Sequence, residues 1–130
     1  MSTRAVGTFE VKLAALLPYN TSEDAKLARM SLDKQFHGDL EAVSKGEMLS
    51  AGTDVKGSAG YVAIERVAGS LAGRDGSFVL QHNATMTRGE PYLNIIVVPD
   101  SGTGGLRGLS GAMRIIIAAG KHSYEFDYSI

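Results

Sequence analysis

The chain contains no cysteine and no tryptophan, and it has only three prolines among its 130 residues. Without cysteine, the protein cannot form disulfides, use thiol catalysis or build a cysteine-based zinc site. No apolar run approaches the roughly 20 residues that a membrane-spanning helix needs. Residues 1–9 also lack the apolar segment of a secretory signal. We therefore expect a soluble, cytoplasmic protein with no membrane partner.

An excess of charge of either sign is also missing. The 13 basic and 14 acidic residues leave a formal net charge of −1. A surface that neutralises many phosphates needs a clear excess of lysine and arginine, so we expect no nucleic-acid partner. The length and the 44% hydrophobic composition indicate a single domain over residues 1–130 that can bury a substantial core.

Glycine, by contrast, is abundant, with 16 residues clustered between apolar runs. The pattern G-x-L-x-G-x-x-G-x-Φ, where Φ is apolar, occurs in residues 69–78 and again in residues 104–113, with a shorter echo at Gly38–Glu41. Glycine adopts the backbone conformations of tight hairpin turns, so each copy predicts a hairpin around one inward-facing leucine. The repetition predicts a series of hairpins and hence an all-β sheet or barrel.

Alternation of apolar and polar residues predicts eight strands. They cover residues 4–16, 28–37, 43–51, 57–71, 77–88, 92–98, 112–119 and 121–130. A short extended segment is expected within residues 101–111, and residues 22–32 could instead form a short helix capped by Ser22. Eight antiparallel strands can close into an up-and-down β-barrel whose interior holds packed side chains or one small ligand.

The glycine-rich stretch Ser101–Gly111 resembles a turn shared by allene oxide cyclases and dirigent proteins. Residues 76–82 and 124–128 resemble the strand before that turn and the aromatic last strand of the same family. Residues 46–48, 57–63 and 81–82 are more similar to a group of small, uncharacterised bacterial proteins with the same barrel. The resemblance implies a calycin-like, allene oxide cyclase-like barrel with an apolar interior, often oligomeric. Its relatives guide cyclisation or coupling without a metal or organic cofactor. It carries over a scaffold but no catalytic residue.

Two carboxylates in apolar strands are candidates for acid–base chemistry. Glu65 and Arg66 are adjacent, so at most one of them points into a barrel. An interior Glu65 without a partner would have a raised pKa and could act as a general base, or both charges could pair on the outer surface. Glu47 could be a second interior carboxylate, or it could form a salt bridge with Arg66, Arg88 or Lys45.

His82 shares its predicted strand face with Phe78, Leu80 and Met86, which indicates the lining of an interior. A histidine there could donate a hydrogen bond to a carbonyl group or transfer a proton. It could equally be a core histidine whose hydrogen bonds are satisfied within the protein. We count Tyr61, on the preceding predicted strand, as a further ligand-binding residue.

The last predicted strand carries Tyr124, Phe126 and Tyr128 on the same face as His122. This face could form an aromatic wall for an unsaturated ligand, with the Tyr124 hydroxyl as a hydrogen-bond donor. It could also be a core strand that closes the barrel against the first strand. The catalytic candidates are His82, Glu65, Glu47 and Tyr124, and the ligand-binding candidates are Phe78, Leu80, Met86, Tyr61, His122 and Phe126.

No motif indicates a metal, a nucleotide or a catalytic nucleophile. The histidines at positions 37, 82 and 122 lack the local spacing of metal ligands. The glycine-rich loop breaks the G-x-G-x-x-G pattern at Arg107, and no G-x-S-x-G turn occurs. We therefore expect no metal and no cofactor.

These observations leave three functions open. The barrel could be a cofactor-free isomerase or cyclase that confines a small hydrophobic molecule near a few polar groups. It could bind such a molecule without catalysis, or its interior could be filled and its function reside on an oligomer surface. The predicted strand at residues 92–98 is apolar on both faces, which favours a homo-oligomer, a dimer or a trimer.

Overall fold

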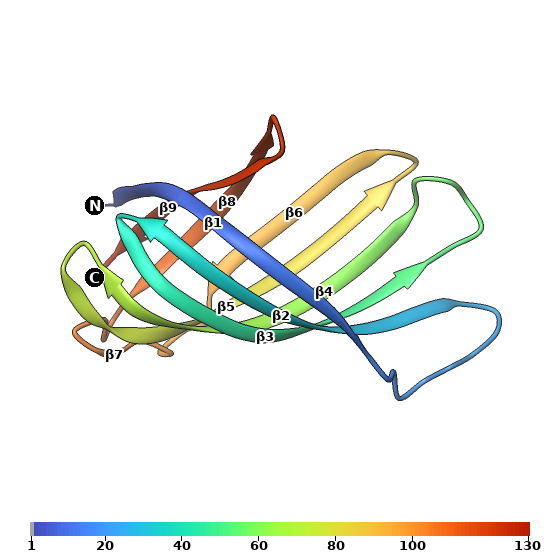
Figure 1. Cartoon of the computed structure of the whole chain (residues 1–130), viewed down its shortest axis with the longest axis horizontal. Coiled ribbons are helices and arrows are strands. Elements are labelled where there is room, and N and C mark those ends of the chain that lie inside the picture. The colour runs from blue at the N-terminus through green and yellow to red at the C-terminus, as the bar shows by residue number, and fades with distance from the viewer. Residues whose placement is uncertain (1) are drawn as a thin grey trace.

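The computed structural model describes residues 2–130, and these residues form nine β-strands and no helix (Figure 1). The strands are β1 (Thr3–Leu16), β2 (Lys26–Gly38), β3 (Leu40–Gly52), β4 (Ala59–Leu71), β5 (Arg74–Thr87), β6 (Glu90–Val97), β7 (Thr103–Gly104), β8 (Ser110–Ala118) and β9 (Lys121–Ser129). In the described part of the chain, the eight long strands match the eight predicted from the sequence, with ends that differ by a few residues.

The strands close into an antiparallel barrel in the order β4-β3-β2-β1-β9-β8-β6-β5, and β5 pairs back onto β4. The short strand β7 pairs only with the start of β5, through Ser77 and Gly76. Side chains alternate between the two faces of each strand, so every second residue points into the barrel. The predicted eight-stranded barrel is confirmed, and the last strand closes against the first, where Phe9 of β1 lies opposite His122 of β9.

One end of the barrel, which carries the β2–β3 and β4–β5 turns and β7, is filled with apolar side chains. We call it the closed end, and both chain termini lie there (Figure 1). The leucines of the three glycine motifs, Leu40, Leu71 and Leu106, are buried there to 1% exposure or less. Leu40 and Leu71 are direct partners between β3 and β4. The predicted inward leucines are therefore confirmed.

The two full copies of the glycine pattern have different structures. The first forms the predicted β4–β5 hairpin, whose turn residues Ala72 and Gly73 both have positive φ, 48° and 85°. The second copy is not a hairpin. It begins in β7, where Gly104 pairs with Gly76 of the first copy, and continues through a loop to β8. Leu106 and Leu109 of that loop are buried and cover the closed end.

The alternative of a helix at residues 22–32 is wrong. Residues 23–24 form a turn, and β2 runs from Lys26 with β1 on one side and β3 on the other. Pairing along both edges of β2 satisfies its backbone hydrogen bonds, and this outweighs the weak local preference for a capped turn. Residues 17–25 form the loop between β1 and β2.

The opposite end of the barrel carries the β1–β2, β3–β4, β5–β6 and β8–β9 connections, and it is open. Along β5, exposure of the inward residues rises from 0% at Leu80 to 43% at Met86. On β6 it rises from 1% at Ile95 to 41% at Leu93, and on β8 from 4% at Met113 to 66% at Ile117.

The strands also separate at this end, because β6 and β8 are paired only at residues 95–96 and 112–113. In Figure 1 the tip of the β8–β9 hairpin stands apart from β6.

Candidate functional site

A layer of polar side chains crosses the barrel interior between the closed end and the open end. It consists of Lys34 on β2, Ser44 on β3, Glu65 on β4 and His82 on β5, which we call the polar layer. All four are buried, with exposures of 8%, 2%, 0% and 4%. Each occupies an inward position of its strand, and the barrel closure from β2 to β5 brings them together.

Glu65 is the centre of the polar layer. Its Oε2 lies 2.8 Å from Nζ of Lys34 and 2.5 Å from Nε2 of His82, and its Oε1 accepts a hydrogen bond of 2.7 Å from Oγ of Ser44. Burial alone would raise the pKa of this carboxyl group. The hydrogen bond from His82, the charge and hydrogen bond of Lys34, and the hydrogen bond from Ser44 outweigh burial and lower the pKa to about 2. Glu65 is therefore an ionised carboxylate at neutral pH, not the proton-accepting base that an unpartnered residue would be.

The ammonium group of Lys34 has further favourable contacts. Its Nζ lies 5.1 Å from the ring centroid of Phe9 and 5.7 Å from that of Phe36. Cations in this position are attracted to the electron-rich ring face. The ion pair with Glu65 and these two rings account for a lysine that is almost fully buried.

His82 is held in one orientation by Glu65. A carboxylate oxygen can only accept a hydrogen bond, so in the neutral imidazole ring the proton belongs on Nε2. The other ring nitrogen, Nδ1, has no hydrogen-bond partner among the described residues, although it is buried. A histidine arranged in this way presents a basic nitrogen whose tautomer is fixed by a carboxylate, the arrangement that general bases use in many enzymes.

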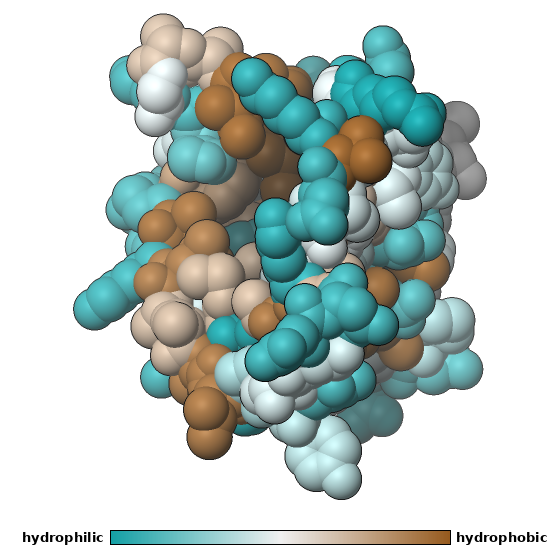
Figure 2. Space-filling view, turned by 90° about the vertical axis from the view of Figure 1, so that its right-hand side faces the viewer, coloured by the Kyte–Doolittle hydropathy of each residue, from teal (hydrophilic) through white to brown (hydrophobic). Residues whose placement is uncertain are grey.

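A cavity of about 350 Å³ lies on the open-end side of the polar layer. Tyr61 and Ala84, the inward residues next to His82, line it, whereas His82 itself does not. The inward-facing residues that line it, which we call the mouth, are Met48, Ser50, Ala59, Tyr61, Ala84, Met86, Pro91 and Leu93. Figure 2 looks onto this end of the barrel and shows hydrophobic surface in a recess bordered by hydrophilic side chains. None of the mouth residues carries a charge, so the mouth suits a small apolar molecule.

Tyr61 connects the mouth with the polar layer. Its ring centroid lies 6.4 Å from that of His82, and it also lines the cavity. Burial and, to a lesser degree, the negative charge of Glu65 raise the pKa of the Tyr61 hydroxyl. The hydroxyl therefore stays protonated over the physiological range and can donate a hydrogen bond.

The other predicted ligand-binding residues divide between the two ends. Phe78, Leu80 and Phe126 lie in the packed core of the closed end, where the rings of Phe78 and Phe126 stack at 5.7 Å. Met86 lines the mouth. His122 lies against Phe9 beside a separate cavity of about 410 Å³, at the point where β1 and β9 cease to pair.

Two of the predicted catalytic residues lie away from the polar layer. Glu47 is on the outer face of β3 and forms an ion pair with Arg29, in which Oε1 of Glu47 lies 2.6 Å from Nη2 of Arg29. Of its two predicted placements, the surface salt bridge is therefore the one observed, with a partner that the sequence did not indicate.

Tyr124 is buried at the closed end. Its hydroxyl accepts a hydrogen bond from the Leu40 backbone N–H and donates one to the His37 carbonyl oxygen. Its role there is to hold the β2–β3 turn against β9.

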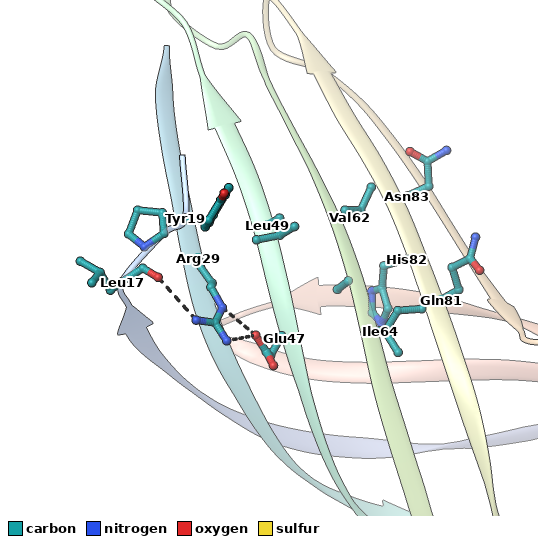
Figure 3. Close-up of a pocket in the computed structure, with 12 residues that line it drawn as sticks. Leu17, Tyr19, Arg29, Glu47, Leu49, Val62, Ile64, Gln81, His82 and Asn83 are labelled. Carbon is teal, nitrogen blue, oxygen red and sulfur yellow. Dashed lines mark hydrogen bonds and ion pairs between the residues drawn. The ribbon is translucent and has the colours of Figure 1, made fainter. Parts of the chain in front are cut away.

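The outer face of the barrel carries a second, larger hollow, about 1080 Å³ in volume (Figure 3). We call it the outer groove. Apart from Ala63 and His82, its walls are outward-facing residues of β2 to β5 and the loop after β1, including Leu17, Tyr19, Leu49, Val62 and Ile64. Each of these five side chains is at least half exposed. The buried, inward-facing residues Ala63 and His82 also border this groove, but its other walls are outward-facing. The mouth is lined mainly by inward-facing side chains of the barrel, and we therefore take it as the candidate site.

The sequence reasoning missed Lys34 and Ser44. A signal for Lys34 was present, because it alternates in phase with Leu32 and Phe36, both of which are buried. A lysine on the apolar face of a strand requires a buried partner. Ser44 gave no comparable signal, because a small polar residue fits either face of a strand.

Two further observations concern cofactors and membranes. Within residues 2–130, no three His, Asp or Glu side chains lie close enough together to hold a metal ion. Over the same residues, the structure has no helix with the length and apolar character needed to cross a membrane.

Comparisons with known proteins agree with this architecture. Residues 5–128 match a family described as "Protein of unknown function (DUF3224)". A crystal structure of a protein with unknown function from the same family, from Shewanella oneidensis MR-1, is 54% identical in sequence, with a TM-score of 0.96. The match covers 100% of this chain and 98% of that one. No curated protein matches the chain significantly. The predicted likeness to uncharacterised barrel proteins is confirmed, whereas the likeness to allene oxide cyclases stays a prediction.

Proposed function

The chain belongs to the DUF3224 family of proteins of unknown function. From the geometry of its polar layer and mouth, we propose that it is a cofactor-free isomerase or cyclase for a small hydrophobic molecule. The molecule would bind in the mouth, and His82 would accept and return a proton. Glu65 would not react itself but would hold His82 in position.

The observation that carries this proposal is the state of the two nitrogens of His82. Nε2 is bonded to the ionised carboxylate of Glu65, while Nδ1 is buried and has no partner within the described residues. A buried polar atom without a hydrogen bond costs about 1–3 kcal/mol, so native proteins keep few of them and often for a functional reason. The mouth ends at Tyr61 and Ala84, the inward residues next to His82.

Charge balance supports an uncharged ligand. The positive charge of Lys34 and the negative charge of Glu65 compensate each other within the polar layer. The mouth adds no charged side chain that could pair with a ligand carboxylate or ammonium group. Because an unpaired charge is costly to bury, a neutral molecule would bind better than an ion of the same shape.

Native mass spectrometry of the protein purified from its own source provides the first test. We expect a co-purifying neutral apolar molecule, whose chemical class then guides a panel of substrates. In that panel His82→Gln should lower turnover at least about 100-fold, the usual size of a general base effect. Gln81→Ala, a change in the adjacent outward-facing residue, is the matched control and should leave turnover unchanged. Equal turnover by His82→Gln and the wild type would contradict the proposal.

A second function, ligand binding without catalysis, is favoured by one specific observation. His82 is only 4% exposed and Tyr61 lies between it and the mouth, so a ligand could occupy the mouth without contacting Nδ1. In that case His82→Gln would leave the affinity of the bound molecule unchanged, and no member of the panel would be converted.

The predicted homo-oligomer also stays a proposal, and the outer groove suggests where the contact would lie. Its exposed apolar residues, with Leu17 at 85% and Tyr19 at 104% exposure, form a more exposed apolar surface than the outward face of β6. Light scattering at micromolar concentration should report a dimer or trimer, and Leu49→Ser with Ile64→Ser should shift it toward the monomer. A monomeric wild type would contradict this proposal.

A further inference from the structure

We infer that Tyr61 and His82 act together on a neutral carbonyl compound: the Tyr61 hydroxyl donates a hydrogen bond to the carbonyl oxygen, and Nδ1 of His82 removes a proton from an adjacent carbon. The inference rests on the proposed function and deepens it, because it names the class of substrate and a second catalytic residue.

The placement of Tyr61 is the first argument. On the inward face of β4, Tyr61, Ala63 and Glu65 follow one another from the open end toward the polar layer. Ala63 lies directly opposite His82 on β5, and Tyr61 lies opposite Ala84. The small side chains of Ala63 and Ala84 take up little space between the tyrosine and the histidine. A substrate in the mouth meets Tyr61, which lines the cavity, and would reach the buried His82, which does not line it, past Tyr61 and Ala84.

The two groups are also chemically complementary. A phenol with a raised pKa remains a hydrogen-bond donor, and Tyr61 is such a group because of its burial and the nearby charge of Glu65. Nδ1 of His82 has no hydrogen-bond partner among residues 2–130, and in the neutral form of the ring it is an acceptor. A substrate that suits both needs an oxygen to accept a hydrogen bond and, close to it, a hydrogen that can be removed. A carbonyl group with an acidic C–H bond on the neighbouring carbon has both features.

The resulting reaction is balanced without any co-reactant. Nδ1 forms a bond to the proton as the C–H bond breaks, and the electron pair of that bond moves into a new C=C bond. The carbonyl oxygen gains negative charge, and the Tyr61 hydroxyl stabilises it. In a β,γ-unsaturated ketone, return of the proton from Nδ1 to the γ carbon gives the conjugated isomer. The carboxylate of Glu65 stabilises the imidazolium that exists between the two transfers.

The uncharged mouth restricts the substrate further. Of the inward mouth residues around Tyr61, Met48, Ala59 and Met86 are apolar, and Ser50, directly opposite Tyr61 on β3, is polar but uncharged. Methionine is flexible and fits flat or irregular apolar groups. The structure therefore favours an uncharged cyclic or branched ketone or aldehyde over a fatty acid or a phosphorylated metabolite.

Proton exchange offers a test that does not require the natural substrate. Cyclic ketones, among them a β,γ-unsaturated cyclohexenone, are incubated with the protein in D₂O, and loss of the α-proton signal and formation of the conjugated isomer are followed by NMR. Ligand-observed saturation transfer in the same samples reports binding. We expect exchange with the wild type, and a decrease of about 10²- to 10³-fold with Tyr61→Phe, the usual effect of removing one oxyanion donor. Tyr128→Phe, on a tyrosine that packs against the apolar core away from the mouth, is the matched control.

The possible outcomes separate this inference from the proposed function. Exchange that is lost with His82→Gln but unchanged with Tyr61→Phe would overturn the role of Tyr61 and leave His82 as the base. Binding without exchange in the wild type would overturn both the carbonyl chemistry and the isomerase, in favour of the binding protein. Loss of exchange in Tyr61→Phe with retained binding would support the inference.

Discussion

The two ends of the barrel are built from the same eight strands but bury their inward residues to different degrees. At the closed end, Phe78, Phe126 and Leu71 are buried to 1% exposure or less and form a continuous apolar core. At the open end, Leu93 and Met86 occupy equivalent inward positions and are more than 40% exposed. Exposed apolar surface in a concave site contributes little to folding and often serves to bind a ligand. The stability of the fold therefore comes mainly from the closed end, and the open end is available to bind a ligand.

The polar layer lies at the border between these two regions. A buried ion pair such as Lys34–Glu65 adds little to stability compared with apolar residues of similar size. Its position next to the mouth, together with the unpartnered Nδ1 of His82, is better explained by function than by folding.

The contrast between the ends predicts the largest difference in stability along β5. Phe78→Ala should lower the free energy of unfolding by about 3–5 kcal/mol, because it removes a fully buried ring and leaves a cavity. Met86→Ala, on the same strand and the same face, should cost less than about 1 kcal/mol, because the side chain is already 43% exposed. Urea denaturation measures both values, and similar losses would remove the distinction between the ends.

The next largest effect on stability is expected for a substitution in the polar layer. Glu65→Gln leaves the buried ammonium group of Lys34 without a counter-charge. We expect the free energy of unfolding, measured by urea denaturation, to fall by about 3 kcal/mol. Glu47→Gln also removes one partner of an ion pair, but this pair lies on the surface, so the loss should be below about 1 kcal/mol. If the two variants were equally stable, Lys34 and Glu65 would not form the buried pair described above.

The same pair predicts how stability depends on pH. Folding lowers the pKa of Glu65 from its ordinary value of 4.5 to about 2. The ionised carboxylate therefore contributes about 3 kcal/mol of stability above pH 4.5, and this contribution is lost as the pH falls toward 2. The free energy of unfolding, measured across that range, should fall more steeply for the wild type than for Glu65→Gln. Parallel curves would argue against a lowered pKa.

The smallest predicted effect concerns the closed end. Tyr124→Phe keeps the buried ring but removes the hydroxyl that bonds to Leu40 and His37, so we expect a loss of about 1–2 kcal/mol. Tyr92→Phe, at an exposed site, should change stability by less than about 0.5 kcal/mol. Turnover or proton exchange should not change in Tyr124→Phe, and a selective loss of activity in this variant would return Tyr124 to the candidate site.

The fold was largely predictable because alternation at period two is a local signal. The inward residues Phe9, Phe36 and His82 follow from that alternation once the strands are identified. The hairpin predicted for the second glycine motif was wrong, because the same residue pattern fits both a hairpin turn and the loop that covers the closed end. Only the partner strand decides between them, and the pairing of Gly104 with Gly76 is a contact between distant parts of the sequence.

The candidate site was only half predictable for a similar reason. The sequence indicated that Glu65 and His82 could face the interior, but it did not indicate that they meet. Their contact depends on β4 and β5 lying side by side in one register, and the ion pair with Lys34 depends on β2 lying two strands away from β4. Without these contacts, a raised pKa was the natural expectation for Glu65, whereas its three partners lower it.

The measurement that tests the central claim most directly is methyl NMR of the methionines during addition of a neutral cyclic ketone. Met48 and Met86 line the mouth, whereas Met113 is inward-facing but buried in the core of the closed end, and it is the control within the same spectrum. We predict that the Met48 and Met86 methyl signals shift in a saturable manner and that the Met113 signal does not. Absence of any saturable shift, or equal shifts of all three, would contradict a ligand site at the open end of the barrel.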